Sequence, residues 1–325
     1  MRQKRHYFAF GIHIESEIPL SVEESTVVSE PDLSIKFSGN FPLTPRISSI
    51  ESYEWSSDGD NGTFCMKIRE SGYIEYRFSN NAFKLEVSCF GEHDIAEKDM
   101  SVFLMGIPLM IYFNLRGIPS IHGNVISFNN QGILITGNSG AGKSTLSAGM
   151  LSAGGKFVND DLTPLIIRNG EAATLPGFGR LKIYPQSLKA LNFDVESAPR
   201  IYSENFPEDK RWYIPNRKSN SESSDIVPIR AAYFLTERKT GISEPLITRL
   251  SPGKACIMLP HHILMERVFR KYLSRKYFEE LLNFATLIPF YQVVLPEDIC
   301  HTEKYANDIL ENSRQHFNNN QSSLC

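Results

Sequence analysis

The chain has 325 residues, of which 41% are hydrophobic, and its 34 basic and 37 acidic residues give a formal net charge of −3. This balance gives no reason to expect binding to nucleic acid or to an anionic membrane surface. Five scattered cysteines without a CxxC pair argue against a disulfide framework or a zinc knuckle, so we expect a soluble protein of the reducing cytoplasm.

Residues 1–95 are predicted to form a β-rich N-terminal region. Short, partly alternating runs such as "YFAFGIHI", "LSIKFSG" and "AFKLEVSCF" are separated by turn-forming segments such as "SSDGDNG". No cluster of His, Cys, Asp or Glu in this region suggests a reaction centre. The sequence leaves its role open, and binding of an acceptor molecule is one hypothesis.

A second region, residues 96–316, is predicted to alternate helices and strands. Its first segment, residues 100–115 ("MSVFLMGIPLMIYFNL"), is short for a bilayer span and is interrupted by Gly106 and Pro108, which favours a buried helix. The strands "SIHGNVISF" and "GILIT" follow, joined by a turn at residues 129–132. Next come the helix "LSAGMLSAGG", the strand "KFVNDD" and a hairpin around residues 169–170.

The last third of the chain is predicted to contain a long polar segment and two closing helices. Residues 193–226 are polar and read as a functional loop or a partly disordered segment. Apolar residues at helical spacing predict helices in residues 261–288 and 303–315. Residues 317–325 are expected to be a flexible tail.

Residues 137–144 match the phosphate-binding pattern GxxxxGK[ST]. Its glycines let backbone N–H groups converge on phosphate oxygens, Lys143 would reach the β- and γ-phosphates, and the Ser144 hydroxyl would bind Mg²⁺. A strand leads in and a helix leads out, as the motif requires, so we predict ATP and Mg²⁺ as cofactors and set aside a chance glycine-rich turn. The expected nucleotide-binding residues are Gly137, Asn138, Ser139, Gly140, Ala141, Gly142, Lys143, Ser144 and Thr145.

Two adjacent aspartates, Asp160 and Asp161, follow Lys143 by 17 and 18 residues, at the end of a predicted strand. The carboxyl edge of an α/β sheet is where ligands bind, so both should lie beside the phosphates. One of them can orient Mg²⁺, a role we assign to Asp160 together with Ser144, and one can accept a proton from an attacking hydroxyl. Which of the two is the base is left open, and the alternative is that they cap a turn.

His122 is expected within the strand "SIHGNVISF", which should lie beside the strand entering the phosphate loop. A lone histidine is more often structural than catalytic, but this position also allows it to tune a carboxylate or to donate to the γ-phosphate. Five basic residues further along the chain could bind phosphates or an acidic acceptor, but each alone is expected to be a solvated surface charge: Arg180, Lys182, Lys210, Arg211 and Arg217.

The order of these motifs resembles the HPr kinase/phosphorylase family, whose core is related to phosphoenolpyruvate carboxykinase. The matching residues are His122-Gly123, the loop at residues 137–144 and Asp160-Asp161. The resemblance implies an α/β fold with a P-loop kinase core. It also implies that Lys143 contacts phosphates, Ser144 binds Mg²⁺, one aspartate is the base on a serine hydroxyl, and His122 assists.

Within that family, two segments look more like the divergent serine kinases of lasso peptide clusters: "YFAFGIHIESEIPL" and "PGFGRLKIYPQS". The resemblance implies phosphorylation of a serine on a small peptide or protein, such as a lasso-type precursor peptide. The stretch "ATLPGFGRLKIYP" has no carboxylate where the carrier-protein enzymes have an acidic segment, which argues against a phosphorylase reaction. The alternatives are an HPr-type carrier-protein kinase/phosphorylase and a nucleotide-sensing module without phosphotransfer, and the subunit number is left open.

Overall fold

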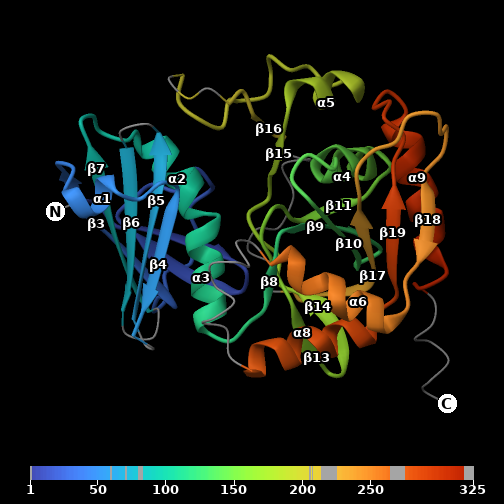
Figure 1. Cartoon of the computed structure of the whole chain (residues 1–325), viewed down its shortest axis with the longest axis horizontal. Coiled ribbons are helices and arrows are strands. Elements are labelled where there is room, and N and C mark those ends of the chain that lie inside the picture. Colours follow the sequence, from blue (N-terminus) through green and yellow to red (C-terminus); the bar gives the residue numbers. More distant parts are fainter. Residues whose placement is uncertain are drawn as a thin grey trace.

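The computed structural model describes residues 2–58, 61–69, 72–79, 83–204, 206, 208–213, 225–263 and 275–317. In these residues the fold is mixed α/β, with a seven-stranded and an eight-stranded sheet as its framework (Figure 1). The N-terminal sheet lies on one side of the molecule and the C-terminal sheet on the other, with α2 and α3 between them.

The N-terminal sheet has the strand order β1-β2-β3-β7-β6-β5-β4. Alternate residues of its strands are buried, as in β7, where Leu85, Val87 and Cys89 enter the core. Its elements are β1 (Arg5–Ala9), β2 (Ile12–Ser16), β3 (Leu33–Phe41), α1 (Pro45–Ser48), β4 (Tyr53–Ser57), β5 (Gly62–Arg69), β6 (Gly72–Ser79) and β7 (Lys84–Gly91).

The apolar run expected to form one buried helix forms two, α2 (Glu97–Leu104) and α3 (Ile107–Leu115). The break lies at Gly106, whose N–H donates to the carbonyl of Phe103 at 3.1 Å, and α3 then begins with a proline in its first turn. Both halves are buried, which confirms that the run belongs to the core. Its interruption turns the chain beside the second sheet.

The tip of the β1–β2 hairpin enters the C-terminal half of the protein. Phe10 has a φ of 54° and its N–H donates to the carbonyl of Pro176 at 2.6 Å. Its ring is 3% exposed and packs edge-on against Phe113 and Phe178. A Cβ on Gly177 would lie 2.5 Å from this ring, so only glycine fits there. The N–H of Gly177 in turn donates to the carbonyl of Val158 at 3.0 Å, so the hairpin tip lies close to the strand that precedes the two aspartates.

Replacing Phe10 with Ala is expected to lower the free energy of unfolding by about 3 to 5 kcal/mol, because it leaves a cavity between the two halves. Phe41→Ala, at a ring that is 41% exposed, is the matched control and should cost under about 1 kcal/mol. Denaturant unfolding followed by intrinsic fluorescence measures both values. Equal losses in the two variants would contradict a packing role for the hairpin tip.

The C-terminal sheet places β10, β17 and β19 side by side and parallel, with antiparallel strands at its margins. α4 (Lys143–Ser152) and α9 (Thr302–Arg314) pack on one face, while α6 (Pro252–Met258) and α8 (Arg275–Leu287) pack on the other. Its strands are β9 (Gly123–Phe128), β10 (Gln131–Gly137), β11 (Lys156–Asn159), β13 (Ile166–Arg168), β14 (Glu171–Thr174), β17 (Val227–Leu235), β18 (Leu246–Arg249) and β19 (Phe290–Val294).

Two predicted hairpin turns are confirmed by their backbone angles. Asn129 and Asn130 have φ values of 50° and 60° between β9 and β10, and Asn169 and Gly170 have 52° and 78° between β13 and β14. Positive φ at both central residues is typical of the type I′ turn, whose backbone twist matches the right-handed twist of the two strands that it joins.

Several short elements connect the sheet to the rest of the protein. They are β8 (Ser120–Ile121), which pairs with β12 (Thr163–Pro164), β15 (Leu181–Ile183), which pairs with β16 (Arg211–Tyr213), α5 (Pro185–Ala190) and the 3-10 turn η1 (Leu259–His262). Parts of the predicted polar loop (residues 205, 207 and 214–224), of the first closing helix (264–274) and of the tail (318–325) lie outside the described residues. Where the structure describes the chain, none of its helices has the length and apolar character that a membrane span requires.

Candidate functional site

The sheet topology brings three predicted segments to one point. β9 is antiparallel to both β10 and β11, so the start of β9 lies beside the ends of the other two strands. His122, just before β9, accepts a hydrogen bond from Thr136 Oγ1 of β10 through its carbonyl, at 2.8 Å. Asp160 and Asp161 directly follow β11. His122 was expected inside a strand, and this is wrong, because it lies in the break between β8 and β9; its expected place beside the phosphate-loop strand is confirmed.

The loop between β10 and α4 has the backbone that its glycines predict. Gly137, Gly140 and Gly142 have φ values of 150°, 83° and 100°, and a Cβ on Gly137 would lie 2.4 Å from the carbonyl oxygen of Leu235. Gly142 is the N-cap of α4, and no side chain caps that end of the helix. The first N–H groups of a helix have no partner within it and carry the positive end of its dipole, so this loop can bind an anion.

Lys143 is buried at the start of α4 with its side chain turned back over the loop. Its Nζ donates to the carbonyl oxygens of Gly137 at 3.0 Å and of Asn138 at 3.2 Å. Burial lowers the pKa of Lys143, and the charges of Asp161 and Asp160 partly offset this effect. The ammonium group therefore lies beside the loop in a position from which it can contact a bound phosphate.

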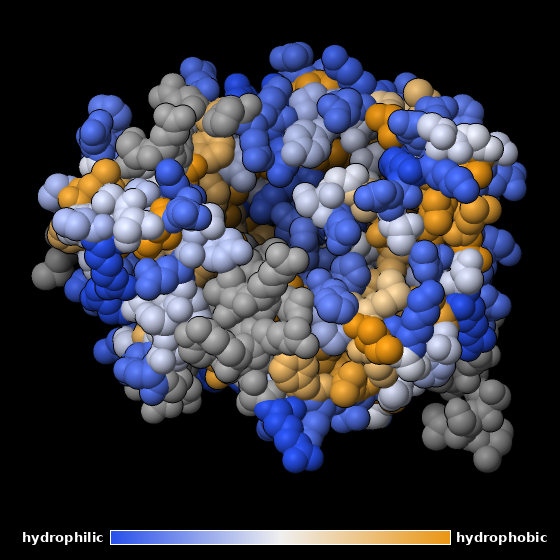
Figure 2. All heavy atoms as spheres, viewed as in Figure 1, coloured by the Kyte–Doolittle hydropathy of each residue, from blue (hydrophilic) through white to orange (hydrophobic). Residues whose placement is uncertain are grey.

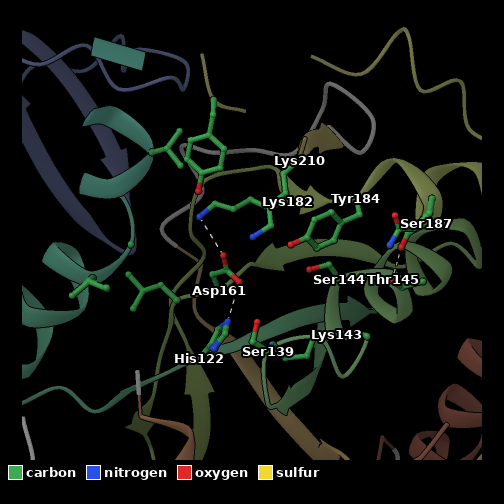
Figure 3. A pocket seen from close by; sticks show the side chains of 18 of the residues that line it. His122, Ser139, Lys143, Ser144, Thr145, Asp161, Lys182, Tyr184, Ser187 and Lys210 are labelled. Atoms are coloured by element: carbon green, nitrogen blue, oxygen red, sulfur yellow. Dashed lines mark hydrogen bonds and ion pairs between the residues drawn. The ribbon is translucent and has the colours of Figure 1, made fainter. Parts of the chain in front are cut away.

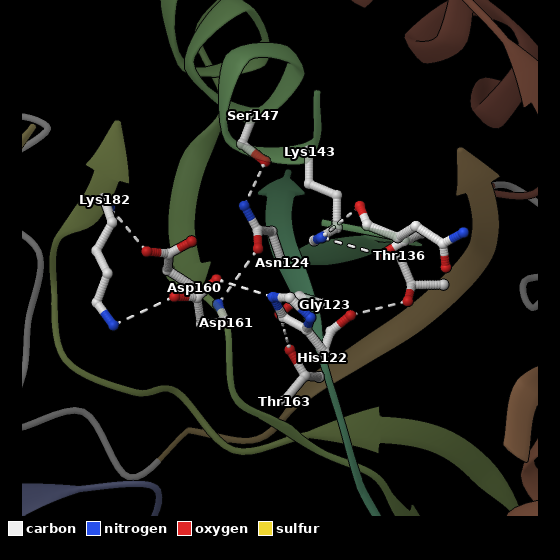
Figure 4. Close-up of polar contacts among 12 residues, drawn as sticks. His122, Gly123, Asn124, Thr136, Lys143, Ser147, Asp160, Asp161, Thr163 and Lys182 are labelled. Atoms are coloured by element: carbon white, nitrogen blue, oxygen red, sulfur yellow. Dashed lines mark hydrogen bonds and ion pairs between the residues drawn. The ribbon is translucent and has the colours of Figure 1, made fainter. Parts of the chain in front are cut away.

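Asp161 is held by two basic side chains, one on each carboxylate oxygen (Figure 4). Its Oδ1 is 3.1 Å from Nε2 of His122, and its Oδ2 is 3.2 Å from Nζ of Lys182. Burial acts to raise the pKa of Asp161, but the charge of Lys182 and the hydrogen bond to His122 outweigh it, and the pKa lies well below its usual range. The side chain is 33% exposed, so an ionised carboxylate faces the site.

Asp160 has a different environment. Its Oδ2 accepts a hydrogen bond from the backbone N–H of Lys182 at 2.7 Å, while its Oδ1 is buried without a hydrogen-bond partner among the described residues. Burial, and secondarily the charge of Asp161, raises the pKa of Asp160 well above its usual value. The two aspartates thus bind opposite ends of one lysine, Asp160 its backbone and Asp161 its ammonium group (Figure 4).

Two residues at this site were not predicted to contact the aspartates. Lys182 was expected to be a surface charge, and this is wrong: its side chain is 18% exposed and forms an ion pair with Asp161. Asn124 is fully buried; its Nδ2 donates to Ser147 Oγ at 3.0 Å, and its Oδ1 accepts from the backbone N–H of Asp161 at 3.3 Å. Asn124 therefore connects α4 to the backbone of Asp161, a residue whose φ is 61°.

Of the other basic residues, Arg180 and Lys210 lie at the border of this site. Arg180 lies over the ring of Trp212 at 4.0 Å, so it is also not a solvated charge. Lys210 forms an ion pair with Glu208 at 3.1 Å. Arg211 pairs with Asp209 at 2.8 Å, and Arg217 lies outside the described residues.

A cavity of about 550 Å³ opens between the phosphate loop and helices α2 and α3. Figure 2 shows a hollow near the centre of the molecule with hydrophilic residues at its floor, and Figure 3 shows Asp161 in the middle of the cavity, between the loop and Lys182. The predicted residues that line it are His122, Ser139, Gly140, Gly142, Lys143, Ser144, Thr145 and Asp161. Asp160 instead borders a neighbouring space of about 30 Å³.

Oxygen donors for a hard cation are present in the cavity. The described residues contain no group of three His, Cys, Asp or Glu side chains that converge as a metal site. Mg²⁺ usually needs only one or two carboxylates when phosphates and water supply its other ligands. Ser144 and Asp161 line the same cavity and fit that requirement, whereas Asp160 is turned toward Lys182.

No model of a known protein family matches the chain, and no curated protein matches it. Among solved structures, the Hpr(Ser) kinase/phosphatase from Coxiella burnetii is similar at 15% sequence identity and a TM-score of 0.31, over 60% of this chain and 96% of that one. A similarity at this level does not establish a family for the chain.

Proposed function

We propose that the protein is an ATP- and Mg²⁺-dependent kinase that transfers the γ-phosphoryl group to a serine hydroxyl of a peptide or small protein. The observation that supports this proposal best is the shared cavity. The cavity contains the uncapped start of α4 and the buried Lys143, which can together bind phosphate. It also contains the ionised carboxylate of Asp161, which can accept a proton. We infer a kinase core of the HPr type from the motif order and this geometry together.

In the proposed reaction, Lys143 and the N–H groups at the start of α4 bind and orient the phosphates. The acceptor hydroxyl attacks the γ-phosphorus as the bond to the β-phosphate oxygen breaks, ADP leaves, and Asp161 takes the hydroxyl proton. Mg²⁺, held by Ser144 together with the phosphates and water, would neutralise the charge on the leaving oxygen. His122 and Lys182 keep Asp161 ionised and oriented.

The base is assigned to Asp161 because of the environments of the two aspartates. Asp161 is exposed to the cavity and has a lowered pKa, so it is ionised at neutral pH. Asp160 accepts from a backbone N–H and has a raised pKa, which suits a positioning residue for Lys182. This changes the metal assignment made from the sequence, in which Asp160 was paired with Ser144.

The deciding experiment uses the purified protein, Mg-ATP and three acceptors: a lasso-type precursor peptide, an HPr-type carrier protein and free serine. Mass spectrometry should show one added phosphoryl group on a serine, with the precursor peptide as the first candidate because of the sequence resemblance. Tight ATP binding without transfer to any acceptor would instead favour a nucleotide-sensing module. Transfer to HPr, reversed by inorganic phosphate, would show a kinase/phosphorylase.

The charge of Lys182 predicts a specific pH dependence. Since the base acts in its unprotonated form, and Lys182 lowers the pKa of Asp161, a Lys182→Met variant should lose activity at a higher pH than the wild type. The acidic limb that belongs to Asp161 should lie below about pH 4 in the wild type and should move up into or above the ordinary carboxylate range in the variant. Lys189→Met, at an exposed lysine of α5, is the control and should keep the wild-type profile. An unmoved limb in Lys182→Met would contradict the assignment of Asp161 as the base.

A further inference from the structure

The cavity has two chemically different sides, with Asp161 between them. On one side lies the phosphate loop. On the other, four apolar side chains come from the N-terminal sheet and its helices: Met66 of β5, Val102 and Phe103 of α2, and Ile107 of α3. Figure 3 shows Asp161 between the labelled residues of the loop and the ribbons of α2 and α3. The N-terminal half therefore contributes a wall to the site, and that wall is apolar.

Ring contacts and hydrogen bonds on the far side of this wall hold its side chains in place. The ring of Phe103 packs against Tyr202 with centroids 5.7 Å apart, and Tyr202 stacks on Phe206 at 4.4 Å. The fully buried carboxylate of Asp99 accepts hydrogen bonds from the N–H and the hydroxyl of Ser203, at 2.7 and 2.6 Å. These two bonds connect residues 201–204 to α2 and hold Tyr202 in the wall.

The apolar wall adjoins the reacting carboxylate. Tyr202 lines the cavity together with Asp161, Lys182 and Leu162. Burial raises the pKa of the Tyr202 hydroxyl despite the nearby charge of Lys182, so this hydroxyl stays neutral and uncharged beside the base. A side chain that contacts the wall therefore lies next to the acceptor hydroxyl, which in the proposed reaction gives its proton to Asp161.

We propose that the wall formed by Met66, Val102, Phe103, Ile107 and Tyr202 binds an apolar side chain directly beside the acceptor serine. The inference rests on the proposed function. In-line transfer requires the acceptor to approach from the side opposite the leaving phosphates, which here is the side of α2 and α3. An apolar neighbour gains free energy when it is buried against this wall, whereas a charged neighbour loses its hydration.

The size and chemistry of the cavity favour a peptide over a polyol. The cavity volume of about 550 Å³ is typical of a pocket for one small-molecule ligand. Beside the phosphates of ATP, the cavity therefore has room only for the acceptor serine and the residues next to it. Four of the five side chains of the wall, Met66, Val102, Phe103 and Ile107, offer no hydrogen-bond partner to the hydroxyl groups of a sugar or of glycerol, and only Tyr202 carries a hydroxyl. The expected acceptor is therefore a serine flanked by Leu, Ile, Met or Phe.

The test uses short peptides of equal length with one serine, in which the residues on either side of the serine are Leu, Phe, Glu or Lys. Peptides with Leu or Phe should show a kcat/KM about tenfold or more above those with Glu or Lys. Phe103→Ala should remove most of this preference and leave the KM for ATP unchanged. Phe41→Ala, which removes a ring outside the cavity, should keep the preference.

Two results would contradict the proposed apolar subsite. One is equal phosphorylation of all peptides, and the other is a preference for charged neighbours. If no peptide is phosphorylated, the proposed phosphoryl transfer fails, and binding decides the subsite separately. Fluorescence anisotropy with a non-hydrolysable ATP analogue should then show tighter binding of the Leu and Phe peptides and weaker binding by Phe103→Ala. Binding without discrimination, or transfer to glycerol but not to peptides, would reject the proposal.

Discussion

An Asp161→Asn protein is expected to transfer phosphate with a kcat lower by a factor of about 10² to 10⁴, which is the usual contribution of a general base. Asparagine keeps the size of the side chain and can accept hydrogen bonds, but it cannot take the proton of the acceptor hydroxyl. Because the phosphates are bound by the loop, affinity for ATP should change much less than kcat. Initial rates of phosphopeptide formation, with ATP binding measured by calorimetry, separate the two effects.

Two further variants make this result specific to Asp161. Asp194→Asn changes an exposed carboxylate of the C-terminal half and should have wild-type kinetics. Asp160→Asn retains an oxygen for the backbone N–H of Lys182 and should reduce kcat less than Asp161→Asn does. If Asp160→Asn is the more damaging of the two, the roles assigned to the aspartates are reversed.

Replacing Lys143 with Met should lower kcat/KM for ATP by about 10² to 10³, a loss typical of removing one charged group that stabilises the transition state. Methionine has a stem of similar length but no charge, so the carbonyls of Gly137 and Asn138 lose their donor and the phosphates lose their cation. Both the affinity for ATP and the rate of transfer should fall, unlike in Asp161→Asn.

The matched control for this variant is Lys189→Met, which removes an exposed charge from α5 and should bind ATP as the wild type does. Circular dichroism should show the same fold in all three proteins. Wild-type ATP affinity in Lys143→Met would mean that nucleotide does not bind at this loop, and the proposed function would fail at its first step.

The parts of the fold that could be predicted are those that depend on local chemistry. The turns at residues 129–130 and 169–170 were predictable because asparagine and glycine adopt positive φ at little cost. The strand, loop and helix around the phosphate-binding pattern followed from its glycines. The pairing of β10 with β17 and the insertion of Phe10 beside Gly177 could not be predicted, since they join segments far apart in the chain.

The site could be predicted as a set of residues but not as a set of contacts. His122, Lys143, Ser144 and Asp161 were named and line one cavity. Lys182 was wrongly predicted to be a surface charge because polar and apolar residues alternate around it, as in a half-exposed strand. No local sequence pattern distinguishes a lysine that faces solvent from one that faces a carboxylate. The apolar wall was missed because its residues come from β5, α2, α3 and residues 201–204, and in the sequence each of these segments resembles ordinary core.

The docking of Phe10 bears on how the protein is made. During translation the N-terminal hairpin leaves the ribosome long before Gly177, the residue that leaves room for its ring. One core cluster joins Phe10 and Phe113 with Leu162, Ile201 and Trp212, so this core is incomplete until the chain beyond residue 212 has emerged. The nascent N-terminal sheet therefore exposes an apolar surface for much of synthesis, which is a natural point for a chaperone to bind. A fragment that ends before residue 176 should expose the same surface and aggregate.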